Sequence, residues 1–220
     1  MTDDSTGVLD RVTVIFQTLA EDAGGMGITE LASRAGLPKS TVSRLVSGLV
    51  DGHYLERDGA TIRLGLRLFE LGQLAESPHA LRRSALPIMT ALRNSTGGSV
   101  ELAIRDDNDM VRVAVARARS DQLTMGRIGE RTPVHSSPLG RAAVAQTRLT
   151  EIVRNALGPD GMPRGVAVLV SPLTSTTHGL EAVIAVTVPA SGADLGQIGA
   201  ALESAARAIE RRLRDAGSVT

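Results

Sequence analysis

Residues 27–49 have the sequence GITELASRAGLPKSTVSRLVSGL, which predicts two short helices joined by a tight turn. The first helix is expected from about Thr29, as its N-cap, to Ala35, and Gly36 supplies a residue that leaves a helix easily with positive φ. A second helix follows Pro38, because proline is tolerated in the first turn. Its buried face is formed by four apolar residues at helical spacing, Val42, Leu45, Val46 and Leu49.

The opposite face of the second helix is polar and cationic. No acidic residue occurs between Leu31 and Val50, so the basic side chains of this window form a local positive patch. Side chains of this kind contact phosphate oxygens and base edges when a helix enters the major groove. A plain helical hairpin with a solvated polar face is the alternative. The predicted DNA-binding residues of this stretch are Arg34, Lys39, Ser40, Thr41, Ser43, Arg44 and Ser47.

A β-hairpin is predicted directly after the second helix. Residues 53–57 and 60–64 have the composition of strands, and Asp58-Gly59 between them is a strong turn signal. Helix, turn, helix and hairpin together describe a winged helix, which favours DNA binding over the plain hairpin. Arg57 and Arg63 lie one on each strand of this wing, where we expect them to contact the phosphate backbone or a minor groove.

The segment 37–58, LPKSTVSRLVSGLVDGHYLERD, and the following LGLRLFELG resemble the N-terminal domain of the IclR family of bacterial transcription regulators. SPLGRAAVA at residues 137–145 is similar to a loop-helix signature in the family's C-terminal domain, and the similarity continues through residues 165–172. The resemblance implies an α+β fold with a winged helix-turn-helix, a linker helix and a GAF-like α/β domain with an antiparallel sheet. It also implies an effector and assembly into homodimers or homotetramers.

Three parts are therefore predicted along the chain. Residues 1–65 form the winged helix-turn-helix domain, whose first element is an amphipathic helix at 8–23. Residues 66–77 form the linker helix, and residues 78–220 form the regulatory and oligomerisation domain. The linker is rich in leucine, so it packs either on its own domain or against a partner chain. The family resemblance favours the partner chain.

Two long helices, one from Ser77-Pro78 and one over 194–215, are expected to cover one face of the antiparallel sheet, with a pocket on the other face. The polar turn at 106–109 has the composition of a calcium loop but lacks the loop glycine and the distal glutamate, so we interpret it as a hairpin turn. The final helix gathers Arg207, Arg211, Arg212 and Arg214, which we expect to be a solvated surface. The other elements expected are strands at 100–104, 111–115, 123–128, 166–170 and 180–188 and helices at 139–146 and 149–156.

The start of the helix at 139–146 is the predicted effector site. A helix N-terminus has unpaired N–H groups and a positive dipole end, which suit a carboxylate such as that of a small organic acid. The alternative is that Ser137 only caps the helix and His135 is exposed. The residues predicted to line the site are Met125, His135, Ser136, Ser137, Gly140, Arg141 and Val168.

One departure from the family bears on this site. Between Leu157 and Gly165 the chain has only a short loop, where IclR relatives carry further helices and a strand. Three outcomes follow: a more open site, a different ligand, or no ligand, with the domain kept for oligomerisation.

Composition narrows the functional class. The chain has 220 residues, 42% hydrophobic and 22% charged, which is typical of a globular protein. Without cysteine it has no disulfide or thiolate ligand, and its four histidines are not at metal-ligand spacing. It has no P-loop or nucleophile elbow, so we expect no enzyme activity, no cofactor and no metal. No signal peptide or membrane span is evident, which predicts a cytoplasmic protein without a membrane partner.

The charge distribution leaves two functions open. Residues 1–79 carry seven basic and eleven acidic residues, a net charge of −4, although the whole chain is neutral. The first hypothesis is a sequence-specific transcription regulator, a repressor modulated by a small molecule, that binds palindromic double-stranded DNA as a homo-oligomer. The alternative is a ligand-sensing or scaffolding protein whose winged helix binds protein, which the acidic N-terminal part keeps open.

Overall fold

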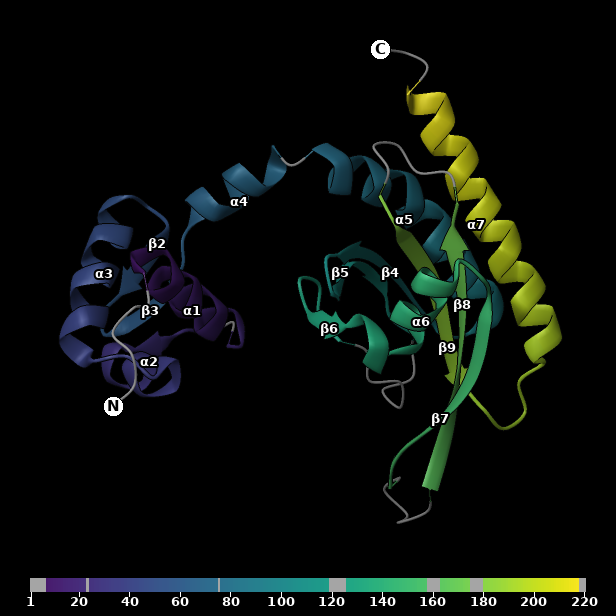
Figure 1. Ribbon diagram of the computed structural model, residues 1–220, viewed down its shortest axis with the longest axis horizontal. Coiled ribbons are helices and arrows are strands. Elements are labelled where there is room, and N and C mark those ends of the chain that lie inside the picture. Colours follow the sequence, from purple (N-terminus) through teal and green to yellow (C-terminus); the bar gives the residue numbers. More distant parts are fainter. Residues whose placement is uncertain are drawn as a thin grey trace. The chain divides into compact units, whose positions relative to one another are not determined.

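The computed structural model describes residues 7–22, 24–74, 76–118, 126–157, 163–174 and 180–217 (Figure 1). Contacts between residues divide the chain into two compact units, Met1–Ala75 and Glu76–Thr220. Each unit has its own hydrophobic core, and each is described by itself below.

The first unit is a winged helix. Its helices and strands are α1 (Val8–Ala20), β1 (Met26–Gly27), α2 (Ile28–Ala35), α3 (Lys39–Asp51), β2 (Leu55–Asp58) and β3 (Thr61–Leu64), followed by α4 (Leu66–Gln73). The three strands form an antiparallel sheet in the order β1-β3-β2. The core joins one face of α1, α2 and α3 to the wing through Ile15, Leu31, Val42, Val46, Leu55 and Ile62, all at most 1% exposed. The predicted apolar face of α3 is confirmed, with Leu45 and Leu49 partly buried against the same core.

The turn between α2 and α3 is built as predicted around Gly36. This residue has φ 64° and ψ 26°, and the Leu37 N–H donates to the Ala32 carbonyl over 3.1 Å, which closes the end of α2. The predicted N-cap Thr29 is wrong, because α2 begins at Ile28 with Gly27 as its N-cap. Gly27 is held in an extended conformation by pairing with Thr61 in the sheet, so the chain enters the helix directly from β1.

The wing is shifted from its predicted position by one or two residues. His53 was expected in a strand but has φ 61° and lies in the turn after α3. Asp58 pairs with Thr61, so the two turn residues are Gly59 and Ala60. Gly59 has φ 58°, a conformation that glycine adopts without steric cost.

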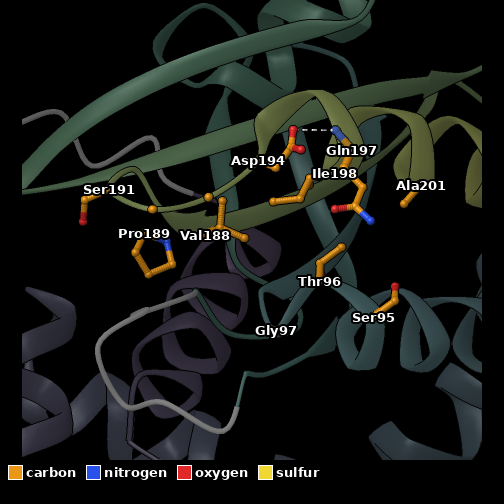
Figure 2. A pocket seen from close by; sticks show the side chains of 12 residues that line it. Ser95, Thr96, Gly97, Val188, Pro189, Ser191, Asp194, Gln197, Ile198 and Ala201 are labelled. Atoms are coloured by element: carbon orange, nitrogen blue, oxygen red, sulfur yellow. Dashed lines mark hydrogen bonds between the residues drawn. The ribbon is translucent and has the colours of Figure 1, made fainter.

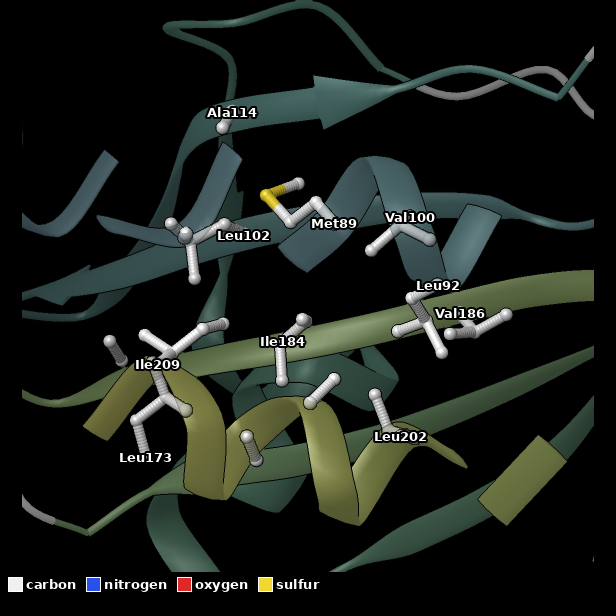
Figure 3. Packing of buried hydrophobic residues seen from close by; sticks show 14 of the residues in the cluster. Met89, Leu92, Val100, Leu102, Ala114, Leu173, Ile184, Val186, Leu202 and Ile209 are labelled. Carbon is white, nitrogen blue, oxygen red and sulfur yellow. The ribbon is translucent and has the colours of Figure 1, made fainter. Parts of the chain in front are cut away.

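The second unit is a six-stranded antiparallel sheet in the order β6-β5-β4-β9-β8-β7. Its strands are β4 (Ser99–Asp106), β5 (Asp109–Ala116), β6 (Arg131–Pro133), β7 (Leu149–Leu157), β8 (Pro163–Leu173) and β9 (Ala182–Pro189). The helices α5 (Glu76–Thr96) and α7 (Leu195–Gly217) pack on one face, as predicted. Figure 3 shows Met89 and Leu92 of α5 and Leu202 and Ile209 of α7 over Ile184 of β9.

The other face of the sheet is covered by the 3-10 turn η1 (Val134–Ser136) and α6 (Pro138–Ala145). Small residues, Ala142 and Ala143 of α6 and Ala103 and Ala185 of the sheet, allow the helix to approach the strands closely. This packing fills the central part of the face on which the pocket was predicted.

The prediction of a helix at 149–156 is wrong, since this segment is strand β7. It pairs with β8 from Leu149, opposite Val170, to Leu157, opposite Pro163. The segment contains the β-branched residues Ile152 and Val153, and backbone pairing with β8 outweighs its weak helical pattern. Most of the predicted strand at 123–128 lies outside the described residues, and Ile128 lies in a turn. In the described part of the chain, no helix is long and apolar enough to cross a membrane.

Candidate nucleic-acid interface and regulatory site

The outer face of α3 carries the predicted DNA-contacting side chains. Lys39, Ser40, Ser43, Arg44 and Ser47 are all exposed. Thr41 is half-buried beside the core. The helix therefore presents one continuous polar face, because its apolar residues are turned into the core on the opposite side.

The electrostatics of this face favour an anion. Within the described residues, the side chains of Lys39 and Arg44 have no hydrogen bond or ion pair. The N-cap of α3 is Pro38, which offers no side-chain acceptor, and the first turn holds no acidic residue. The N–H groups of this turn and the positive end of the helix dipole are thus not neutralised by a local carboxylate. Such a helix start suits a phosphate group.

Arg34 has a different environment from the α3 residues. Its guanidinium donates to Glu21 of the turn after α1 over 2.7 Å and to Glu30 of α2 over 3.5 Å. The hydrogen bond to Glu21, followed by the charges of both carboxylates, raises the pKa of Arg34 above its usual value. Arg34 therefore ties α2 to the end of α1, and its charge is balanced in this structure.

The two wing arginines lie on opposite faces of the hairpin. Arg57 is paired with Ile62 across the strands, whereas Arg63 is paired with Glu56, and side chains alternate along a strand. Arg57 is exposed and has no described partner. The Nε of Arg63 donates to the Gly24 carbonyl over 2.9 Å and its Nη1 lies 3.3 Å from Asp58. Arg57 is thus the freer of the two cations.

The predicted effector residues meet at the start of α6 but are engaged locally. Ser137 is the N-cap, and its Oγ accepts a hydrogen bond from the Gly140 N–H over 3.2 Å. Ser136 Oγ donates to the Pro133 carbonyl over 3.0 Å, and His135 is exposed. These contacts fit the capping alternative.

The other predicted effector residues also have partners in the fold. Arg141 forms an ion pair with Glu151 of β7, and its Nη1 donates to the His135 carbonyl over 3.4 Å. Val168 is 8% exposed in the core beneath α6. Met125 lies outside the described residues. A carboxylate ligand would have to displace Glu151 to reach the Arg141 guanidinium.

The buried carboxyl group of Glu101, on the sheet face that α6 covers, was not predicted. Glu101 is 4% exposed and forms an ion pair with Arg112 of β5, whose Nη1 lies 3.3 Å from Glu130. Burial raises the pKa of Glu101, an effect that the charge of Arg112 partly offsets. A register shift after Leu102 brings the two side chains together, and a sequence pattern does not reveal such a shift.

A pocket of about 380 Å³ lies at one end of the helix layer (Figure 2). It is lined by the C-terminal end of α5, the turn after β9 and the first turns of α7. The Asp194 carboxylate accepts a hydrogen bond from the Gln197 N–H over 3.0 Å and so already caps α7. This pocket lies beside the two long helices and contains none of the predicted effector residues.

A winged helix whose helix α3 carries free cationic side chains, joined to a separate α/β unit, has the architecture that is typical of two-part transcription regulators. Two family models match the chain, the IclR helix-turn-helix domain over residues 8–59 and the bacterial transcriptional regulator IclR C-terminal domain over residues 73–158. The chain belongs to the IclR family.

Curated relatives are similar over both units. The chain is 29% identical over 151 residues to the HTH-type transcriptional regulator XynR of Escherichia coli K12, a match that covers 68% of this chain and 59% of that protein. It is 30% identical over 170 residues to the acetate operon repressor of Salmonella typhimurium LT2, covering 75% and 62%. The chain thus spans about six-tenths of the length of these relatives. Both are regulators and neither is named as an enzyme.

Solved structures support the fold. An IclR homologue from Microbacterium hydrocarbonoxydans, solved with 4-hydroxybenzoate, superposes with a TM-score of 0.76 at 23% identity, covering 95% of this chain and all of that one. A putative transcriptional regulator from Rhodococcus sp. RHA1 gives a TM-score of 0.69 at 19% identity, covering 94% and 98%. The predicted α+β architecture with an antiparallel sheet in the second unit is confirmed.

Proposed function

We propose that this chain is a sequence-specific DNA-binding transcription regulator that acts as a repressor in the bacterial cytoplasm. The observation that carries the proposal is the outer face of α3, where Lys39 and Arg44 have no described partner and the helix start has no acidic residue. Arg44 and the exposed serines contact base edges, and Lys39 and Arg57 contact phosphates. Similarity to the acetate operon repressor supports repression over activation.

Assembly of two chains through α4 accounts for the exposed apolar residues of this helix. No residue of α4 is buried within the described chain, and Leu66 and Phe69 are 66% and 63% exposed. A soluble helix rarely leaves such a surface in water, so a second chain covers it. Two recognition helices then read a palindromic operator, as a homodimer or within a homotetramer. In this proposal α4 is the linker between the two domains.

A small organic acid is the proposed effector class. The positive N-terminal end of α6 and the Arg141 guanidinium support a carboxylate, and a solved IclR homologue contains 4-hydroxybenzoate. The ligand carboxylate replaces Glu151 as the partner of Arg141. It changes DNA affinity only to the extent that it binds one arrangement of the regulator more tightly than the other.

Fluorescence anisotropy of the full chain tests the DNA-binding proposal. Labelled duplex from upstream of the protein's own gene is compared with a scrambled duplex at several salt concentrations. Preferential binding that weakens steeply with salt is expected, because phosphate contacts release counterions. Equal, weak binding to both duplexes would exclude sequence-specific DNA recognition and favour a winged helix that binds protein.

A further inference from the structure

Arg63 of β3 joins the wing to the turn that follows α1. Its Nε donates to the Gly24 carbonyl over 2.9 Å, a contact between residues 39 positions apart in the chain. Its Nη1 lies 3.3 Å from the Asp58 carboxylate, at the end of β2. One guanidinium group is therefore engaged both with the body of the winged helix and with the hairpin of the wing.

The Gly24 carbonyl is oriented by hydrogen bonds within its own turn. The Asp22 carboxylate accepts a hydrogen bond from the Gly24 N–H over 2.9 Å, and the Asp22 carbonyl accepts one from the Gly25 N–H over 3.0 Å. Gly25 has φ 75°, a conformation that glycine adopts without steric cost. The acceptor for Arg63 is thus built into the backbone of this turn.

The turn also packs tightly against β3 around Arg63. A Cβ built on Gly25 would lie 2.5 Å from Arg63 Cγ and 2.4 Å from the Ile62 carbonyl oxygen. The backbone pairing of β3 with the strand that follows this turn is short, because β1 consists of Met26–Gly27 alone. Arg63 therefore adds a side-chain anchor where the sheet supplies two residue pairs.

A second arginine ties the same turn to the helix-turn-helix. Arg34 of α2 donates to Glu21, the residue after α1, over 2.7 Å. Helix α2 packs in one core with α3. The contacts of Arg34 and Arg63 thus connect α2, the turn and β3, so they help to fix the position of the wing relative to the recognition helix.

The contacts of Arg63 also affect the charges of the wing. Side chains alternate along β2, so Arg57 and Asp58 project from opposite faces of the hairpin. Asp58 is 76% exposed, so its pair with Arg63 contributes little to stability, but the pair holds the carboxylate on the face away from Arg57. Arg57 is exposed and has no hydrogen bond or ion pair among the described residues. Its charge stays available for a phosphate.

We propose that Arg63 is a positioning residue that holds the wing where Arg57 contacts a phosphate of the duplex that α3 reads, and that Arg63 itself makes no DNA contact. The proposal rests on the DNA-binding function proposed above. It differs from the expectation that both wing arginines contact DNA, because Nε and Nη1 of Arg63 are already engaged within the winged helix. A direct phosphate contact by Arg63 is the alternative that the experiment separates.

Salt-dependent DNA binding of the full chain, between 50 and 200 mM salt, distinguishes the two roles. Each phosphate contact contributes about 0.9 to the slope of log K against log salt, so Arg57→Ala is expected to lower the slope by about 0.9. Arg63→Ala should lower it by a similar amount, because the wing no longer presents Arg57, and R57A/R63A should lower it no further. A fall of about 1.8 in R57A/R63A would mean two independent phosphate contacts and overturn the proposal.

Arg63→Lys supplies a second readout. Lysine keeps the positive charge, so a direct phosphate contact at this position would survive and the slope would stay at that of the unmodified protein. One ammonium group cannot replace the Nε and Nη1 contacts together. A positioning role therefore predicts that Arg63→Lys shifts the slope towards that of Arg63→Ala. An unmodified slope in Arg63→Lys, with a loss in Arg63→Ala, would show a direct contact instead.

Two matched variants control for net charge and for additivity. Arg67→Ala removes a positive charge that is paired with Glu70 on α4, and it should leave the slope unchanged. K39A/R57A removes two independent phosphate contacts and should lower the slope by about 1.8. Circular dichroism checks that each variant folds. Partial unfolding lowers the affinity by a similar factor at each salt concentration, so it does not imitate a change of slope.

The remaining outcomes separate this proposal from the DNA-binding function. If Arg57→Ala leaves the slope unchanged, Arg63 has no phosphate contact to position, and the proposal is overturned while DNA binding through α3 stands. The same holds if Arg57→Ala lowers the slope but Arg63→Ala does not. Absence of salt-sensitive DNA binding by the unmodified protein overturns both proposals.

Discussion

Arg44 is the residue on α3 whose removal bears most directly on base recognition. Its side chain is exposed in the middle of the polar face and has no described partner. Arg44→Ala is expected to cost about 1–3 kcal/mol of binding free energy on the specific duplex if the guanidinium makes a bidentate base contact. Anisotropy titrations at matched salt measure this loss.

Arg67 on α4 provides the control for this change. It is exposed and paired with Glu70 over 3.0 Å, so Arg67→Ala removes one positive charge from the same unit without touching α3. Its effect on binding should be small and equal on both duplexes. A loss of affinity in Arg44→Ala no larger than that in Arg67→Ala would contradict the assignment of Arg44.

Gly140 shows how a single residue fixes α6 against η1. A Cβ built at this position would lie 1.9 Å from the Val134 carbonyl oxygen, and Gly140 itself is buried. Gly140→Ala is therefore expected to lower the free energy of unfolding by about 3 kcal/mol, because a backbone atom cannot move aside cheaply. Urea denaturation measures the change.

Gly72 on α4 provides the control for the Gly140→Ala substitution. A Cβ there meets no atom within 4 Å, so Gly72→Ala should be neutral or stabilise the protein by up to about 1 kcal/mol. Similar unfolding midpoints for the two variants would show that the close approach of Gly140 to η1 does not exist in solution.

At the scale of elements, α4 is a helix with no buried residue in the described part of the chain. Leu66, Phe69, Leu71 and Leu74 are 66%, 63%, 42% and 76% exposed. Phe69→Glu is expected to weaken self-association by about 2 kcal/mol or more, roughly thirtyfold in Kd, since it places a charge in an apolar contact. Analytical ultracentrifugation over a concentration series detects the shift towards monomer.

Gln73→Glu adds the same charge to the same helix without removing an apolar side chain. Gln73 is exposed at the end of α4, and this variant should keep the association of the unmodified protein. If the unmodified protein is already monomeric, α4 is not the contact between chains. The same conclusion follows if Phe69→Glu leaves self-association unchanged.

At the scale of the whole molecule, the Glu101–Arg112 pair couples stability to pH. Burial raises the pKa of Glu101 in the folded state, so the folded protein holds a proton that the unfolded chain has released. The contribution of Glu101 to the free energy of unfolding is therefore fully present below the ordinary carboxyl pKa. It is lost as the pH rises through the raised pKa of the folded state. The difference in unfolding free energy between the unmodified protein and Glu101→Gln should therefore decline over this range.

Urea denaturation at several pH values gives this difference. A difference for Glu101→Gln that stays constant or grows with rising pH would mean that the charge of Arg112 outweighs the cost of burial.

The local elements were predictable from sequence because their signals are local. The spacing of Val42 and Val46 identifies the buried face of α3, and Gly36 marks the turn before it. Strand β7 was missed because its conformation depends on pairing with β8, which no local pattern records. Thr29 was misassigned as a cap for a similar reason, since Gly27 is fixed by β3 across the sheet.

By itself, the sequence determined that a cationic recognition helix is followed by a wing, and that the chain resembles IclR regulators. Periodicity and turn chemistry act over a few residues, so they survive without the fold. Only the tertiary structure decided which charges are free: Arg34, Arg63 and Arg141 are held by carboxylates or carbonyls, whereas Arg44 and Arg57 have no described partner. Glu21, Gly24 and Glu151 belong to other elements than the arginines they hold, and only folding brings these groups together.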